Sequence, residues 1–101
     1  MDLKYLAQNP ELAMNSGAVI TICLMIGDML YCVNLGDCRA VLCRDSTALN
    51  LSVDHKASST HEQNRIKKSG GYMYNNRVFG RLAVTRSIGD FDLKGYWDDQ
   101  M

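Results

Sequence analysis

The sequence has little proline, no net charge and no long apolar run, and each of these absences excludes a class of protein. One proline among 101 residues, with 47% apolar and 22% charged residues, is typical of a chain with a packed core rather than a disordered tail. Eleven basic residues balance eleven acidic ones, so no overall charge favours nucleic acid or a membrane surface. We therefore expect a single small globular unit, with no nucleic acid and no membrane as partner.

The chain also has too few apolar residues in a row to suggest a membrane span or a secretion signal. The longest nearly uncharged stretch covers residues 16–27, whereas a membrane-spanning helix needs about 20 apolar residues. The first residues include Asp2 and Lys4 and do not form a cationic start followed by an apolar core. We expect an intracellular protein, either cytoplasmic or nuclear.

The cysteine content allows several interpretations. Three of the four cysteines lie in apolar, strand-like runs, and nothing indicates an oxidising compartment; the four are Cys23, Cys32, Cys38 and Cys43. Reduced thiols in the core are the favoured interpretation. Two disulfides remain an alternative, as does a zinc site that includes His55 and His61, although the sequence has no C-x-x-C pair.

Four apolar runs predict strands, at residues 18–26, 30–35, 39–43 and 49–53. Short turn-forming pairs separate them, so we expect an antiparallel meander whose tips carry Asp28, Asp37 and Asp45. The first run has many β-branched residues and almost no polar interruption, which predicts a strand covered on both faces.

Two helical segments flank the strands. Residues 1–13 have a broken helical pattern, which Pro10 splits. A second helix is predicted over residues 60–69, because Ser59 and Glu62 have the spacing of a capping box and Gly70 with Gly71 suits a left-handed end. These helices cover a sheet thinly, so we expect a partner or further sequence to supply a second layer.

Three stretches then match one known family in order: YCVNLGDCRAVLCRD, LSVDHKASSTHEQNRIKKSGG and RVFGRLAVTRSIGDFDLK. Together they resemble the metal-dependent protein serine/threonine phosphatases of the PPM type, also called type 2C. The resemblance implies an α+β fold, part of a four-layer α-β-β-α sandwich with antiparallel sheets, in which a β-meander precedes a helix and a flap-like segment. It also implies that residues 1–101 are the central portion of the phosphatase domain, without its N-terminal and C-terminal metal-ligand segments.

The resemblance assigns candidate site residues, although it leaves no complete catalytic set in this chain. Asp37 matches an aspartate that the family associates with an additional metal, and the cofactor is expected to be Mg²⁺ or Mn²⁺, which prefer oxygen ligands. The alternative is that Asp37 only favours the turn after Gly36. Lys56 and Arg77 match positions on or beside the family's flap, where cations would meet the phosphate of a phosphoprotein substrate; the alternative for both is solvated surface charge.

Four further residues of the matching stretches are expected to be structural. Arg39 should anchor its turn through an ion pair, and His55 should act as a hydrogen-bonding residue rather than a general acid. Arg86 and Asp90 should form a network that holds the flap to the core.

Three functions follow as hypotheses. The first is a protein serine/threonine phosphatase that hydrolyses phosphoserine and phosphothreonine by a metal-activated water, with this portion inactive alone. The second is a non-catalytic, phosphatase-like module that binds a phosphoprotein or a partner chain, and the third is a small structural α+β domain. An incompletely covered sheet also predicts self-association.

Overall fold

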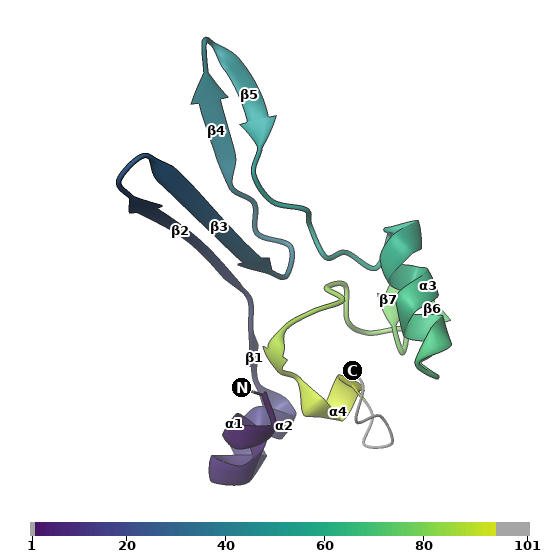
Figure 1. Cartoon of the computed structure of the whole chain (residues 1–101). Helices are drawn as coiled ribbons and strands as arrows, with labels where there is room; N and C mark the ends of the chain where they lie inside the picture. Colours follow the sequence, from purple (N-terminus) through teal and green to yellow (C-terminus); the bar gives the residue numbers. More distant parts are fainter. Residues whose placement is uncertain (1, 95–101) are drawn as a thin grey trace.

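The computed structural model describes residues 2–94, which form short helices and four pairs of antiparallel strands (Figure 1). The helices are α1 (Asp2–Gln8), α2 (Pro10–Asn15), α3 (Thr60–Lys68) and α4 (Phe91–Lys94). The strands are β1 (Gly17–Ala18), β2 (Ile20–Ile26), β3 (Met29–Leu35), β4 (Val41–Arg44), β5 (Thr47–Asn50), β6 (Met73–Tyr74), β7 (Arg77–Val78) and β8 (Ile88–Gly89). The α+β class predicted from the sequence is confirmed. None of the described helices is long and apolar enough to cross a membrane.

The proline in the N-terminal region separates two helices, as its position predicts. Pro10 occupies the first turn of α2, where its missing N–H has no helical acceptor to lose. The backbone N–H of Ser16 donates to the carbonyl of Leu12 at 2.8 Å and closes the helix. Ala13, on the inner side of α2, is completely buried.

Two hairpins form most of the strand structure, and each has a two-residue turn. β2 pairs with β3 from Ile20–Leu35 to Ile26–Met29, and β4 pairs with β5 from Val41–Asn50 to Arg44–Thr47. In the second turn, Asp45 and Ser46 have φ of 50° and 60°, which matches the left-handed turn that suits strand twist.

The prediction of a continuous meander is wrong, because β3 and β4 belong to separate two-stranded sheets. The backbone of Gly36, directly after β3, forms hydrogen bonds with His55 and not with β4. The Gly36 N–H donates to Nδ1 of His55 at 3.0 Å, and the Gly36 carbonyl accepts the N–H of His55 at 2.8 Å. A contact with His55, 19 residues further along the chain, therefore takes the place of a ladder between β3 and β4.

The prediction that the first strand is covered on both faces is also wrong for the described residues. Large apolar side chains of the β2–β3 hairpin are exposed, among them Leu24 at 52%, Met25 at 72% and Ile26 at 59%. Among the residues whose burial the structure describes, the buried apolar core is small by comparison and consists of Ala13, Ala57, Ile66 and Val78. The favoured placement of the cysteines in a core fails for the same reason, since Cys23, Cys38 and Cys43 are exposed.

Helix α3 begins and ends close to where the sequence predicts. Its C-terminus forms a Schellman motif: Gly70 has φ of +88°, its N–H bonds to the Lys67 carbonyl, and the Gly71 N–H bonds to the Ile66 carbonyl. The predicted capping box is wrong, because Ser59 makes no side-chain cap hydrogen bond. The Glu62 carboxylate binds other groups instead.

The last strand pairs with the first, which brings residues far apart in the chain together. Gly17 lies opposite Gly89, and Ala18 lies opposite Ile88. Gly89 has φ of +83°, and a Cβ there would collide with the carbonyl oxygen of Ser16, so only glycine allows this close approach. The β1–β8 pair therefore ties the N-terminal helices to the end of the described chain (Figure 1).

Candidate functional site

Three segments meet where the hairpins join the rest of the molecule. We call this region the junction and define it as Gly36, residues 54–57 and residues 83–86. The Ala57 N–H donates to the Ala83 carbonyl at 2.8 Å, and the Thr85 N–H donates to the His55 carbonyl at 3.0 Å. Lys56 and Val84 form an isolated antiparallel bridge between the same two segments. The junction thus connects all three stretches of the chain that carry the sequence resemblance.

His55 holds the junction together through its ring and its backbone. Its Nδ1 accepts the Gly36 N–H, so this nitrogen carries a lone pair and the ring is bound in its neutral form. Burial lowers the pKa of His55, and the positive charge of Arg86 lowers it further. The structural hydrogen-bonding role predicted for His55 is confirmed.

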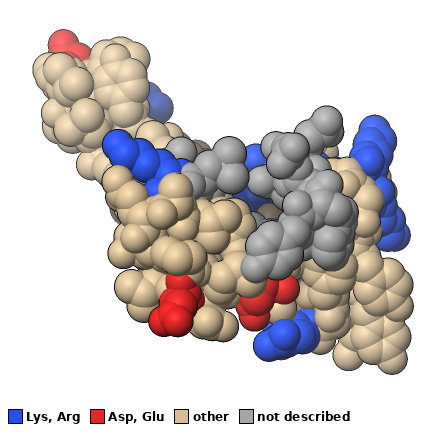
Figure 2. All heavy atoms as spheres, turned by 90° about the horizontal axis from the view of Figure 1, so that it is seen from below, with Lys and Arg blue, Asp and Glu red and all other residues tan. Residues whose placement is uncertain are grey.

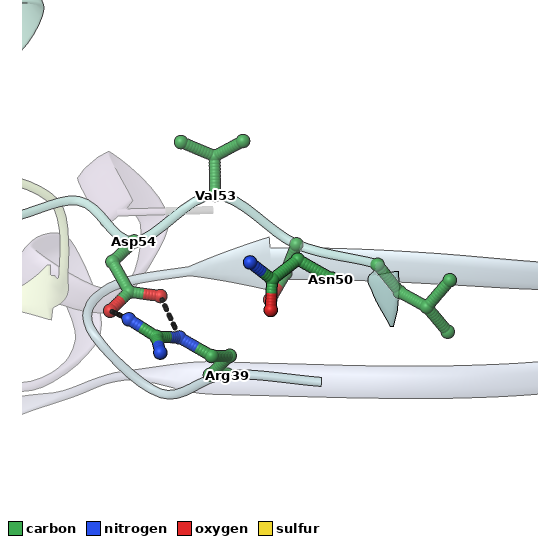
Figure 3. Close-up of a pocket in the computed structure, with 6 residues that line it drawn as sticks. Arg39, Asn50, Val53 and Asp54 are labelled. Atoms are coloured by element: carbon green, nitrogen blue, oxygen red, sulfur yellow. Dashed lines mark hydrogen bonds and ion pairs between the residues drawn. The ribbon is translucent and has the colours of Figure 1, made fainter. Parts of the chain in front are cut away.

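Arg39 and Asp54 form the ion pair on one side of the junction (Figure 3). The Arg39 Nε and Nη2 atoms donate to the two Asp54 oxygens at 3.2 and 2.8 Å, in a bidentate geometry. Lys56 Nζ lies 3.3 Å from Asp54 Oδ2. Hydrogen bonding from Arg39 lowers the pKa of Asp54 and the same contact raises the pKa of Arg39. The anchoring ion pair predicted for Arg39 is confirmed.

A shallow hollow of about 340 Å³ lies beside this ion pair. Its lining comes from Arg39 and residues 50–54, and Figure 3 shows Val53 pointing away from the facing side chains of Arg39 and Asp54. Two exposed cations share the carboxylate of Asp54, with Arg39 52% and Lys56 47% exposed. The cluster therefore carries an excess of one positive charge at neutral pH.

Glu62 is the buried charged centre on the other side of the junction. Its side chain is 3% exposed and accepts two hydrogen bonds from Arg86, Nε to Oε1 at 2.8 Å and Nη2 to Oε2 at 3.0 Å. The Thr85 hydroxyl donates to Oε1 at 2.8 Å, and Arg65 Nε donates to Oε2 at 3.2 Å. Glu62 thus attaches α3 to residues 85 and 86.

These contacts decide the ionisation of Glu62. Burial by itself would raise the pKa of its carboxyl group, but hydrogen bonds from Arg86, Thr85 and Arg65 outweigh burial and lower the pKa to about 2. Contact with Glu62 raises the pKa of Arg86 in turn. The carboxylate therefore stays charged at every physiological pH, which suits an anchor and not a proton-transfer group.

The structure places the three predicted site residues in three separate surroundings. Asp37 is exposed in the bend after β3, Lys56 contacts Asp54, and Arg77 lies on β7 with Nη1 donating to the Arg81 carbonyl at 2.9 Å. Among residues 2–94, no hydrogen bond or ion pair joins these three side chains. Their roles in metal and substrate binding stay predictions.

The donor set around Asp37 does not by itself fit a metal centre. Within the described part of the chain, no group of three or more His, Cys, Asp or Glu side chains is arranged to hold a metal ion. Magnesium and manganese require several oxygen ligands, and Asp37 supplies one carboxylate. We therefore derive no chemical step through a metal from these residues.

Charge on the surface is local rather than spread as one field. On the face that Figure 2 shows, Lys and Arg occur in small separate groups within a largely uncharged surface, and one of these groups lies beside an acidic group. Recognition of an anionic ligand would therefore depend on individual clusters such as Arg39 with Lys56.

The sequence analysis missed the central role of Glu62, because its spacing from Ser59 suggested a capping box. The signal that could have found it is Arg86 in the third matching stretch, which is expected to hold the flap to the core together with Asp90. Arg86 fulfils that expectation through Glu62. The part of this prediction that concerns Asp90 is wrong: among the described residues its backbone N–H donates to the Ser16 carbonyl at 2.8 Å, away from the Arg86–Glu62 pair.

Comparison with known proteins gives a consistent result. The family model for protein phosphatase 2C matches residues 1–99. "Probable protein phosphatase 2C 47" of Oryza sativa subsp. japonica is 42% identical over 89 residues, which are 88% of this chain and 23% of the relative. "Protein phosphatase 2C homolog 1" of Schizosaccharomyces pombe is 53% identical over 66 residues, 65% of this chain and 19% of the relative.

The chain thus spans about a fifth of the length of these curated relatives. The match nonetheless extends over nearly the whole of this chain and includes the junction with all three sequence stretches. The chain belongs to the protein phosphatase 2C family.

Proposed function

We propose that this chain carries the hairpin and flap portion of a protein serine/threonine phosphatase, and that this portion does not turn over substrate by itself. The observation that supports the proposal is the family match over residues 1–99. The complete activity would be hydrolysis of phosphoserine and phosphothreonine in phosphoproteins. The contribution of this chain would be to position and bind, because the described residues offer no complete catalytic set.

Asp37 is proposed as one oxygen ligand of Mg²⁺ or Mn²⁺, with other ligands coming from elsewhere in a phosphatase domain. Its exposed carboxylate in the bend after β3 is available to a cation. A hard divalent ion needs about six oxygen ligands, so a single carboxylate would hold it weakly. This weakness is the physical reason for the proposed inactivity.

Asp37→Asn is expected to leave phosphate release from a phosphoserine peptide at zero, as in the unchanged chain, while weakening the binding of Mn²⁺. Asparagine also suits turns, so the bend should persist while the charge is lost. Phosphate release is measured colorimetrically and Mn²⁺ binding by titration calorimetry.

Asp45→Asn is the matched control, because Asp45 lies in the β4–β5 turn and has a φ that asparagine adopts readily. Phosphate release that increases with the amount of chain and disappears in Asp37→Asn would contradict the proposed inactivity. Equal Mn²⁺ binding by all three chains would return Asp37 to the role of a turn residue.

A second candidate function, a non-catalytic module that binds a phosphoprotein, is favoured by the exposed cations. Lys56 adds to the positive excess beside Asp54, and the exposed Arg77 guanidinium uses one of its five N–H donors on the Arg81 carbonyl. Such groups can bind a phosphate through charge-assisted hydrogen bonds.

The combined substitution Lys56→Ala and Arg77→Ala is expected to weaken binding of a phosphoserine peptide by about tenfold or more, since a hydrogen bond to a charged group contributes about 1.5–3 kcal/mol. Fluorescence anisotropy of a labelled peptide measures the affinity. Lys4→Ala removes an exposed charge on α1 and serves as the control for net charge. If binding is unchanged in the double variant, or equal for the unphosphorylated peptide, Lys56 and Arg77 are only solvated surface charges.

A further inference from the structure

Two cysteines lie directly opposite each other in the β2–β3 hairpin, outside the junction. Cys23 pairs with Cys32 in the strand register, and their Sγ atoms are 3.9 Å apart, with Cys23 donating to Cys32. Cys23 is exposed and Cys32 is half-buried. Neither thiol takes part in the function proposed above.

The position of this pair in the ladder suits a covalent bond. Ile26 and Met29 close the two-residue turn and form a hydrogen-bonded pair, and such pairs alternate with non-hydrogen-bonded ones. Counting from the turn makes Cys23–Cys32 a non-hydrogen-bonded pair, for which the Cα atoms are about 4.5 Å apart. A disulfide accepts Cα separations of roughly 4.4–6.8 Å.

We propose that Cys23 and Cys32 form a reversible oxidation site, at which a two-electron oxidant of the peroxide class converts the two thiols into an intrachain disulfide. Rotation of the side chains about their Cα–Cβ bonds brings the sulfurs together without a change in register. The bond closes across the two strands and fixes their pairing.

The reaction balances with hydrogen peroxide as the named oxidant. The Cys23 thiolate attacks one peroxide oxygen, the O–O bond breaks, and a sulfenic acid and one water are formed. The Cys32 sulfur then attacks the Cys23 sulfur and displaces the hydroxyl group, which leaves as a second water after taking up the Cys32 proton. Two thiols and one peroxide thus give one disulfide and two waters.

The surroundings of the two thiols indicate which of them reacts first with the oxidant. Cys23 is the more exposed thiol, so the oxidant reaches it first. Burial raises the pKa of Cys32, and the contact with Cys23 raises it further, which disfavours its thiolate as the first nucleophile. Cys32 therefore acts as the resolving thiol.

The experiment uses the full chain with Cys38→Ser and Cys43→Ser, so that two thiols remain. Dilute protein is treated with hydrogen peroxide, and free thiols, intact mass and migration on non-reducing gels are followed. We expect both thiols to disappear together, with loss of two hydrogen atoms per chain, no dimer, and full recovery with dithiothreitol. Cys32→Ser in the same background should instead stop at a sulfenic acid that dimedone traps.

A matched control keeps two thiols but moves one to the other face of the strand. Cys32→Ser with Val33→Cys does this, since Val33 pairs with Ile22 and neighbouring residues of a strand point to opposite faces. Intrachain closure should be slower in this control by about tenfold or more, because the reacting atoms are no longer held together. Equal closure rates, or products of the original pair that are only dimers or separately oxidised thiols, would overturn the proposal.

Discussion

Glu62→Gln is expected to lower the free energy of unfolding at neutral pH by roughly 3 kcal/mol, the amount that follows from breaking a buried ion pair on one side. The change keeps the size of the side chain but removes the charge that both Arg65 and Arg86 contact. The Arg86 guanidinium is then left half-buried without its carboxylate partner. Chemical denaturation followed by circular dichroism measures the loss.

The same substitution should also change how stability depends on pH. The pKa of Glu62 is about 2 in the folded chain against an ordinary 4.5, so its contribution is fully present above pH 4.5 and is lost as the pH falls from 4.5 towards 2. The lowered pKa of His55 affects stability at a higher pH. The fold favours the neutral form of His55, so stability also falls as the pH drops below about 6.5. In Glu62→Gln the loss of stability between pH 4.5 and pH 2 should disappear, while the loss below about pH 6.5 should remain.

Glu11→Gln is the control for this experiment, because Glu11 is exposed on α2 and its side chain has no ion pair among the described residues. Its stability should match the unchanged chain within about 0.5 kcal/mol, as for most surface changes. If Glu62→Gln is as stable as Glu11→Gln at neutral pH, Glu62 is not the group that attaches α3 to residues 85 and 86.

The second large effect concerns the β2–β3 hairpin, which we expect to make the chain self-associate. One face of the hairpin is apolar along its whole length and consists of Ile20, Ile22, Leu24, Ile26, Met29, Tyr31, Val33 and Leu35. Most of these side chains are strongly exposed, with Ile22 at 48% and Val33 at 57%. Both outer edges of this two-stranded sheet also carry backbone groups that can pair with another strand.

The paired substitution Ile22→Lys and Val33→Glu should convert the associated chain into a monomer and reduce its binding of a hydrophobic dye several-fold. The two residues are directly opposite in the register, so an ion pair can replace the apolar contact and keep the hairpin. Sedimentation velocity at several concentrations measures the association.

Leu12→Lys is the control, since Leu12 is 57% exposed but lies on α2 rather than on the hairpin. It should associate like the unchanged chain. An unchanged chain that sediments as a monomer at every concentration would show that the exposed hairpin does not cause association.

Local sequence signals predicted several turns and helix boundaries, because these features depend on neighbouring residues, but they did not predict β6, β7, β8 or α4. The break at Pro10, the left-handed end at Gly70 and the two-residue turn at Asp45 each follow from the backbone preferences of those residues. These features need little information from the rest of the chain. The structural roles of Arg39 and His55 were also assigned correctly, but from the family resemblance and without naming their distant partners.

Pairings between distant segments could not be predicted in the same way. The meander failed because Gly36 bonds to His55, 19 residues further along, and no periodic pattern reports such a contact. Glu62 was misassigned because a local capping role and a distant ion pair require the same side chain. The apolar pattern of β2 predicts that burial is favourable, but it does not say which residues provide it.

The β1–β8 pair sets an order for events during synthesis. Its two strands are roughly 70 residues apart in the chain, and closing a loop of that length costs roughly 4 kcal/mol of chain entropy. A hairpin with a two-residue turn can form within about 1–10 μs, whereas a ribosome adding about 5–20 residues per second needs several seconds to reach β8. The apolar hairpin of β2 and β3 is therefore complete on the nascent chain for seconds before β1 can pair with β8. During that interval the hairpin is an exposed apolar surface to which a chaperone can bind.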